Sequence, residues 1–151
     1  MISYLTFEYV LKIHDELIVE YGGAKGVLNE GLLRSAIETP KACFNGHDLH
    51  RTIFDKTAAY LFHIIQNHPF VDGNKRTAAM AAMVFFSSNF NGGFCIFDAE
   101  YQDLILRIAQ GAVSKKEIAR FFRDTRVTGT SSLLEIRDSS LDLGLKDRDS
   151  R

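Results

Sequence analysis

The sequence predicts an all-α fold, a mainly helical bundle with at most one small β-hairpin. Two observations favour this class. Apolar residues recur at helical spacing along most of the chain up to about residue 125. Gly, Pro and capping residues separate these segments at the places where helices would begin and end. A folded part of this length can bury one hydrophobic core, so we expect a single domain.

The first part of the chain predicts two helices and a connection. The first begins after Thr6 and ends at Gly22-Gly23, and its apolar face consists of Phe7, Val10, Leu11, Ile13, Leu17 and Ile18. A shorter helix ends near Pro40, because proline cannot continue a helix, and it carries Leu32, Leu33, Ala36 and Ile37. Residues 41–50 are polar without a clear period, which indicates a loop or a short hairpin.

Two longer helices are expected to form the centre of the domain. One runs from about Arg51 to Asn67 and is broken by Pro69. The next begins near Asn74 and runs to about Asn89. Its stretch 78–86 is apolar all round, which predicts the buried central helix, and its alanines allow neighbouring helices to approach closely.

The last part of the chain predicts two more helices and a tail. Residues 94–97 are read as an extended segment, and Asp98 as the cap of a helix that closes at Gly111. Ser114 and Glu117 form a capping box at the start of the last core helix. Residues 126–151 contain no aromatic residue and are rich in Ser, Asp and Arg. We therefore expect a domain over 1–125, and a tail over 126–151 that is loosely ordered or packed on the domain or a partner.

Composition narrows the class of protein. The 151 residues are 46% hydrophobic and 25% charged with a formal net charge of −1, which is ordinary for a globular protein and argues against direct nucleic-acid binding. No apolar stretch is long enough to cross a membrane, and the N-terminus does not resemble a signal peptide. Cys43 and Cys95 are expected to be free thiols, so a cytoplasmic location is predicted.

Residues 68–76 combine the chemistry expected of a phosphate site, and they lie at a helix, turn, helix junction. His68 is a candidate general base, and Asp72 is an oxygen ligand suited to Mg²⁺. The amides that open the following helix favour anions. Candidate phosphate-binding residues are Gly73, Asn74, Lys75 and Arg76, and Phe70 is expected to point into the core and fix the loop.

Two other interpretations of these residues remain open. A metal hydrolase would use some of the histidines as ligands, namely His47, His50, His63 and His68, but the sequence has no His-Glu-x-x-His pattern. A non-catalytic binding module would use the same surface only to hold a partner.

The segment from His68 to Ala79 resembles the Fic superfamily signature, His-x-Phe-x-Asp/Glu-Gly-Asn-Gly-Arg-x-x-Arg. It departs from that pattern at Lys75, in place of Gly, and at Ala79, in place of the second Arg. Both departures are those of the Doc branch, the death-on-curing toxins of toxin–antitoxin pairs. The resemblance extends over about residues 3–124, through Tyr4-Leu5-Thr6, Ile13-His14-Asp15, Tyr21-Gly22-Gly23 and the run 31–36 before Pro40.

The resemblance implies a Fic/Doc-like fold and a transferase that uses ATP and Mg²⁺. Its Doc branch implies transfer of the γ-phosphoryl group to a Ser or Thr hydroxyl, with growth arrest as the outcome. The implied target is the translation elongation factor that delivers tRNA, and the implied partner is an antitoxin. Transfer of AMP is the alternative. A homo-oligomer is also compatible with the sequence.

The resemblance also assigns roles to two segments outside the motif. A flap that positions the target is implied for Lys41, Ala42, Cys43, Phe44 and Asn45. In the tail, Ser131 and Glu135 loosely match an inhibitory Ser/Thr-x-x-x-Glu motif, although Ile136 stands where Gly or Asn is expected. Such a motif would imply self-inhibition by the tail.

Overall fold

The computed structural model describes residues 1–90 and 98–124. These residues form six α-helices, namely α1 (Phe7–Tyr21), α2 (Glu30–Glu38), α3 (Ile53–Asn67), α4 (Asn74–Asn89), α5 (Ala99–Ala109) and α6 (Lys115–Asp124). A 3₁₀ turn (Thr39–Lys41) and two short strands, β1 (Cys43–Phe44) and β2 (His47–Asp48), lie between α2 and α3. The predicted class, all-α with one small hairpin, is confirmed.

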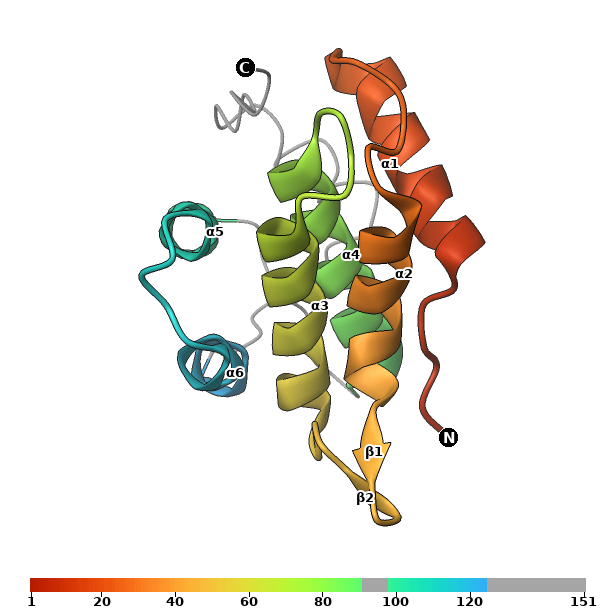
Figure 1. Cartoon of the computed structure of the whole chain (residues 1–151). Helices are drawn as coiled ribbons and strands as arrows, with labels where there is room; N and C mark the ends of the chain where they lie inside the picture. Colours follow the sequence, from red (N-terminus) through yellow and green to blue (C-terminus); the bar gives the residue numbers. More distant parts are fainter. Residues whose placement is uncertain (91–97, 125–151) are drawn as a thin grey trace.

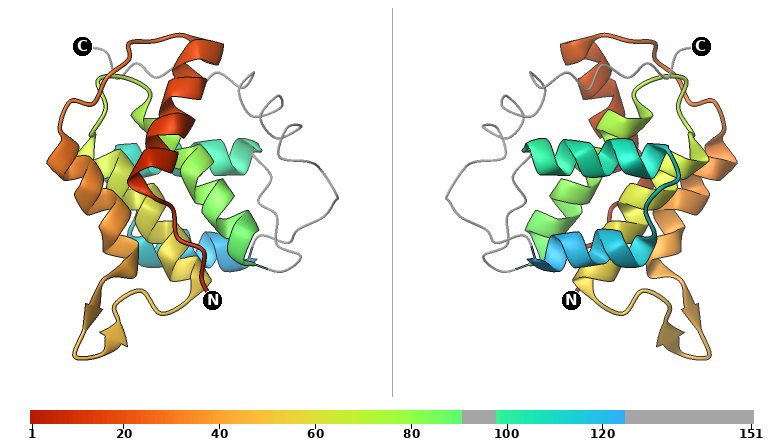
Figure 2. Two further views of the ribbon diagram at one scale, coloured as in Figure 1. Left: turned by 90° about the vertical axis from the view of Figure 1, so that its right-hand side faces the viewer. Right: turned by 90° about the vertical axis from the view of Figure 1, so that its left-hand side faces the viewer.

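The helices lie in three layers. Figure 1 shows α3 and α4 in the middle, α1 and α2 on one side of them, and α5 and α6 on the other. Figure 2 shows that α5 and α6 run across the central pair rather than along it. The most extensive helix contacts join α3 to α4 and to α6. The middle layer is therefore covered on both sides, which explains why the sequence of α4 has no polar face.

Helix α4 is the buried central helix, as predicted. Its alanines Ala78, Ala79, Ala81 and Ala82 are at most 1% exposed, and these small side chains let α3 and the other helices approach closely. The hydroxyl of Tyr101 on α5 donates to the carbonyl oxygen of Ala79 at 2.9 Å, so the polar atom of this fully buried ring is satisfied.

The predicted helix starts are confirmed by their caps. The side-chain oxygens of Thr6 and Asp98 accept the amides of Tyr9 and Tyr101. Ser114 and Glu117 form the expected capping box, with both hydrogen bonds present. Such caps satisfy amides that a helix start leaves without an intrahelical partner, and each typically contributes about 1 kcal/mol.

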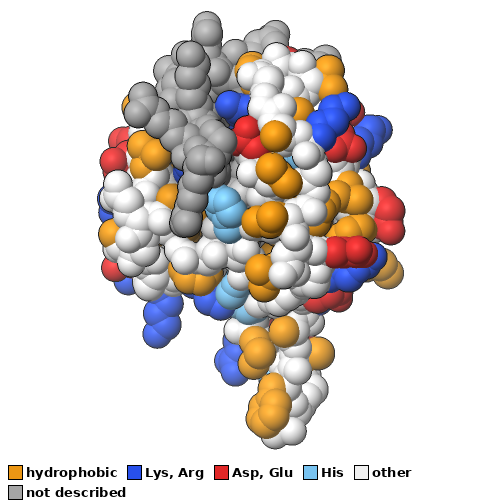
Figure 3. All heavy atoms as spheres, turned by 45° about the horizontal axis from the view of Figure 1, so that its top comes forward, with side chains coloured by type: hydrophobic (Ala, Val, Ile, Leu, Met, Phe, Trp, Pro, Cys, Tyr) orange, Lys and Arg blue, Asp and Glu red, His pale blue; other side chains and the backbone are white. Residues whose placement is uncertain are grey.

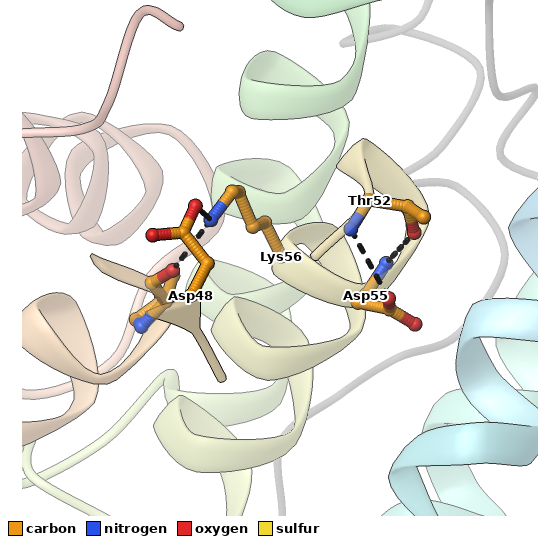
Figure 4. A network of polar contacts seen from close by, with 5 residues as sticks. Asp48, Thr52, Asp55 and Lys56 are labelled. Carbon is orange, nitrogen blue, oxygen red and sulfur yellow. Dashed lines mark hydrogen bonds and ion pairs between the residues drawn. The ribbon is translucent and has the colours of Figure 1, made fainter. Parts of the chain in front are cut away.

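The hairpin is fixed at its base by a buried lysine. Its turn residues, Asn45 and Gly46, both have positive φ, as tight hairpin turns require. The side chain of Lys56, which is fully buried, donates to Asp48 Oδ2 at 3.1 Å and to the carbonyl oxygen of Pro40 at 3.3 Å (Figure 4). Burial alone would lower the pKa of Lys56, but its contacts with Tyr4 and Asp48 outweigh burial and raise it, so the ammonium stays charged.

None of the helices within 1–90 and 98–124 combines the length and the hydropathy that a membrane span requires. The extended segment expected at 94–97, the thiol of Cys95 and the tail 126–151 lie outside the described residues, and so do Ser131 and Glu135.

Candidate functional site

His68 lies at the C-terminal end of α3, where the chain turns toward α4. Its backbone has φ 47° and ψ 54°, the left-handed conformation. Histidine adopts this region more readily than most residues, yet it still costs energy for any side chain with a Cβ atom. Backbone strain of this kind is common at functional sites. The side chain is half-buried, so His68 is held by its surroundings and still open to solvent.

Asn74 closes the turn that follows His68. Its side-chain oxygen accepts the amide of Phe70 at 2.9 Å, and its side-chain nitrogen donates to the carbonyl oxygen of Phe70 at 2.9 Å. Asn74 is 1% exposed and Phe70 is fully buried. The side chain that the sequence suggested for phosphate binding thus holds the backbone of the turn, and its backbone amide lies at the start of α4.

Asp72 is bound from both sides by backbone amides. Its Oδ1 accepts the amide of Gly73 at 2.9 Å, and its Oδ2 accepts the amide of Ala24 at 3.1 Å. Gly23 lies so close to Asp72 that a Cβ atom added to this glycine would be 2.6 Å from Asp72 Oδ2. The loop between α1 and α2 is therefore part of the wall of the site.

The residues around Asp72 fit a magnesium ion that arrives with a nucleotide. Each carboxylate oxygen retains a lone pair beyond its single hydrogen bond. Among the residues that the structure describes, no three His, Cys, Asp or Glu side chains come together as a metal site. Mg²⁺ commonly binds to one or two carboxylates and takes its other ligands from phosphate and water oxygens, and a single carboxylate is enough for that mode.

The remaining phosphate-binding residues of the prediction meet at the start of α4. Gly73 has φ 79° and, without a side chain, gives the helix no capping hydrogen bond. Lys75 is half-buried and Arg76 is 9% exposed, with its guanidinium carbon 5.4 Å from the centre of the Tyr21 ring. The helix start carries a partial positive charge, and these two cations add to it. This end of α4 therefore favours an anion.

His14 is a residue of this region to which the sequence analysis gave no role. It is 1% exposed, and its Nε2 lies 2.8 Å from the carbonyl oxygen of Asp72. A carbonyl oxygen only accepts, so Nε2 is the donor. The imidazole also stacks on Phe70, with ring centres 3.9 Å apart and planes 6° apart. The sequence contained one indication of this contact: a histidine on the apolar face of α1 needs a buried hydrogen-bond partner.

Loss of the His14 hydrogen bond is expected to disturb the turn. Phenylalanine at position 14 keeps the stack on Phe70 but leaves the carbonyl oxygen of Asp72 unpaired. We expect His14→Phe to lower the free energy of unfolding by about 1–3 kcal/mol and, through displacement of the turn, to lower kcat for group transfer by about tenfold. Glutamine, whose amide nitrogen reaches a position close to Nε2, should restore most of both. Urea unfolding and steady-state kinetics of the three proteins test this, and an unchanged kcat in His14→Phe would contradict it.

The hairpin is not brought together with His68. It precedes α3, whereas His68 follows it, and the 15 residues of α3 separate the two by about 22 Å at 1.5 Å per residue. Figure 1 shows the hairpin and the α3–α4 turn at opposite ends of the molecule. The residues that the sequence suggested as a target-positioning flap, Lys41, Ala42, Cys43, Phe44 and Asn45, thus lie at the end remote from the α3–α4 turn. The β1 residues Cys43 and Phe44 are exposed.

The other histidines lie elsewhere. His47 is in β2, and His50 and His63 converge on Lys115 rather than on His68, with their Nε2 atoms 3.2 and 3.1 Å from its Nζ. Burial, together with the charge of Lys115, lowers the pKa of His63 to about 4. Both imidazoles are therefore suited to accept hydrogen bonds from the lysine, which joins the start of α6 to α3.

Comparison with known proteins gives consistent matches. A family model described as the Fic/DOC family matches residues 4–86, which include α1 to α3, the turn and most of α4. A protein of Mycolicibacterium smegmatis named Toxin Doc is 40% identical over 89 residues, which is 59% of this chain and 66%, slightly under two thirds, of that protein. A protein of Escherichia phage P1 named Protein kinase doc is 31% identical over 121 residues, 80% of this chain and 93% of that protein.

Proposed function

The chain belongs to the Fic/DOC family, and from this premise we propose that it is a Doc-like toxin that transfers the γ-phosphoryl group of ATP to a Ser or Thr hydroxyl of another protein. The observation that carries the proposal is the junction of α3 and α4. A half-buried histidine in a left-handed conformation ends one helix, and the cationic start of the next helix lies six residues further on.

In this proposal His68 is the general base. Its half-buried side chain is open to an incoming hydroxyl, and a histidine can take up a proton near neutral pH. As the acceptor oxygen bonds to the γ-phosphorus, the bond from phosphorus to the bridging oxygen breaks and ADP leaves. The hydroxyl proton passes to His68, which balances the step.

The turn and the start of α4 hold the phosphates. Gly73 permits close approach of the backbone, and the first amides of α4 would bind phosphate oxygens, because a helix start favours anions. Arg76 and Lys75 neutralise phosphate charge, and Asp72 is the residue that would hold Mg²⁺. When bound, the metal would supply positive charge that stabilises the phosphate groups during transfer. The Asn74 side chain keeps this arrangement in place through Phe70.

Ala79 supports phosphate rather than AMP as the group transferred. The Fic signature has a second arginine at this position, and that arginine would bind the outer phosphates in an AMP-transferring pose. Here the position is occupied by Ala79, a residue of α4 that is 1% exposed. It therefore supplies no cation to the site. Lys75 adds a long cationic side chain where the signature has glycine. Both differences disfavour a pose in which the α-phosphate faces His68.

The transferred group can be identified directly with labelled ATP. Incubation with a candidate acceptor and ATP labelled in the γ-phosphate is expected to label the acceptor, whereas ATP labelled in the α-phosphate is not. Intact mass of the acceptor provides the second measurement, because an added phosphate and an added AMP differ greatly in mass. Label from the α-phosphate alone would replace the kinase proposal with adenylyl transfer, the alternative activity.

The partners follow from the same proposal. The acceptor we propose is the translation elongation factor that delivers tRNA, whose modification arrests growth, and an antitoxin neutralises the activity. A non-catalytic binding module is the second alternative, and it predicts that toxicity survives the loss of His68.

A further inference from the structure

Lys115, at the start of α6, lies between two imidazoles. Its Nζ is 3.2 Å from His50 Nε2 and 3.1 Å from His63 Nε2. All three side chains are half-buried, and histidine side chains reach the surface on the face of the molecule that Figure 3 shows. We call these three residues the lysine–histidine cluster. The activity proposed for His68 gives this cluster no role.

Lys115 differs from Lys41 and Lys56 in its partners. Lys41 forms an ion pair with Glu38, and Lys56 forms one with Asp48. A carboxylate at this distance stabilises the ammonium form of a lysine. Within residues 1–90 and 98–124, the groups bonded to Lys115 Nζ are the two imidazoles, and no carboxylate is paired with it. Lys115 therefore lacks the negative charge that holds a proton on the other two.

The surroundings of Lys115 favour a neutral amine beside neutral imidazoles. Burial lowers the pKa of Lys115, and the partial positive charge of a helix start also disfavours an ammonium there. The pKa of His63 is lowered to about 4, and burial and Lys115 lower the pKa of His50 too. Of the charged groups of α3 that face His50, Lys56 lowers this pKa and Asp55 raises it.

The geometry of the cluster is that of an activated nucleophile. A neutral amine has two N–H groups and one lone pair, so each imidazole can accept one N–H while the lone pair stays available for reaction. A nucleophile within hydrogen-bond reach of a base is the arrangement that covalent chemistry requires. Lysines that are partly removed from water are also the ones that lose their proton and react with carbonyl carbon.

We propose that Lys115 is a site of covalent acylation, at which its amine takes the acyl group of a small activated donor, an acyl phosphate or an acyl thioester. The nitrogen lone pair forms a bond to the acyl carbon. The bond from this carbon to its phosphate oxygen or its sulfur breaks, and phosphate or thiolate leaves. The proton that the nitrogen loses passes to an imidazole of the cluster and then to solvent, which balances the step.

Acylation of Lys115 would weaken the attachment of α6. The modified nitrogen carries no charge and has one N–H, so it can donate to one imidazole instead of two. His63 is in α3, and the contacts between α3 and α6 are among the most extensive in the domain. Modification would therefore loosen the start of α6 from α3.

The reactivity of each lysine in the full-length wild-type protein tests the site. The protein is incubated at neutral pH with acetyl phosphate and, separately, with acetyl-coenzyme A, and mass spectrometry of its peptides gives the acetylation rate of each lysine. Lys116 is the matched control, because it is the next residue and is exposed. With at least one donor, Lys115 is expected to react about tenfold faster than Lys116, since more of its amine is neutral and a base is in contact with it. Its rate should also level off at a lower pH.

A double variant, His50→Gln with His63→Gln, tests the role of the imidazoles. Glutamine can accept a hydrogen bond through its carbonyl oxygen but does not take up a proton. The rate at Lys115 is expected to fall to that of Lys116, while the rate at Lys116 stays unchanged. Equal or slower reaction of Lys115 in the wild type with both donors would overturn the proposal. An unchanged rate at Lys115 in a folded double variant would overturn the role of the imidazoles.

The effect on α6 is measured with Lys115→Gln, which has no charge, as in the acetylated side chain. Its melting temperature is expected to fall by about 3 °C, the shift that follows the loss of one hydrogen bond in a domain of this size. Lys116→Gln is the control and should match wild type, and wild-type protein acetylated at Lys115 should melt with Lys115→Gln. A melting temperature of Lys115→Gln equal to that of wild type would contradict the loosening of α6.

Discussion

Replacing His68 with asparagine is expected to lower kcat for group transfer by about 10²–10⁴-fold, the usual contribution of a general acid–base residue. The reason for choosing asparagine is the backbone. His68 has φ 47°, and asparagine adopts the left-handed region readily, whereas alanine adds strain of roughly 1 kcal/mol there. His68→Asn therefore removes the base and leaves the turn in its conformation.

The measurement combines kinetics with ATP binding and unfolding. If His68 acts in chemistry, His68→Asn keeps the ATP affinity and the urea midpoint of the wild type while transfer is lost. His68→Ala is the matched comparison, with the same loss of transfer and a slightly lower midpoint. Transfer by His68→Asn at the wild-type rate would assign the proton to another group, and unchanged toxicity of this variant in cells would favour the non-catalytic binding module.

Replacing Asn74 with alanine is expected to lower the free energy of unfolding by about 2–6 kcal/mol. The side chain makes two hydrogen bonds to the backbone of Phe70 in a site that is 1% exposed. Alanine leaves one amide and one carbonyl group of the buried turn without partners, and each costs roughly 1–3 kcal/mol. Because the turn also positions His68 and Gly73, transfer should fall together with stability.

Replacing Asn74 with aspartate tests the two hydrogen bonds separately. Its carboxylate can accept the amide of Phe70 but cannot donate to the carbonyl oxygen of Phe70, and it places a negative charge beside the proposed phosphate site. We expect Asn74→Asp to be destabilised and also to bind ATP more weakly than Asn74→Ala. Urea midpoints and ATP affinities of the three proteins provide the test. A loss of stability below about 0.5 kcal/mol in Asn74→Ala would show that the turn does not depend on this side chain.

Much of the fold was predictable because its signals are local. Thr6, Asp98 and Ser114 each cap a helix by accepting an amide three residues further on. The apolar run 78–86 predicts the buried helix from its own residues alone. In the same way, the helix, turn, helix pattern predicts that one helix ends at His68. It also predicts that the next helix begins beside Gly73, Lys75 and Arg76.

The parts that the sequence did not predict depend on distant residues. The hydrogen bond from His14 to Asp72 joins positions 58 apart in the chain, and that from Ala24 to Asp72 joins positions 48 apart. No local pattern encodes such pairs. The side chain of Asn74 is a different case, because the sequence shows an amide in a turn but not whether it faces a ligand or the backbone. The remote position of the hairpin was implicit in the length of α3, since 15 residues at 1.5 Å place its two ends about 22 Å apart.

The loop between α1 and α2 also determines where the chain tolerates a change of length. Ala24 is bonded to Asp72, and Gly26 is bonded to Val71. One residue added or removed in this loop would shift its register against the α3–α4 turn. At the tip of the hairpin, by contrast, a Cβ on Gly46 would meet no described atom within 4 Å. An affinity tag inserted beside Gly46, with this glycine kept because its φ is 76°, therefore lies at the opposite end of α3 from His68, whereas the α1–α2 loop is a fixed-length part of the proposed site.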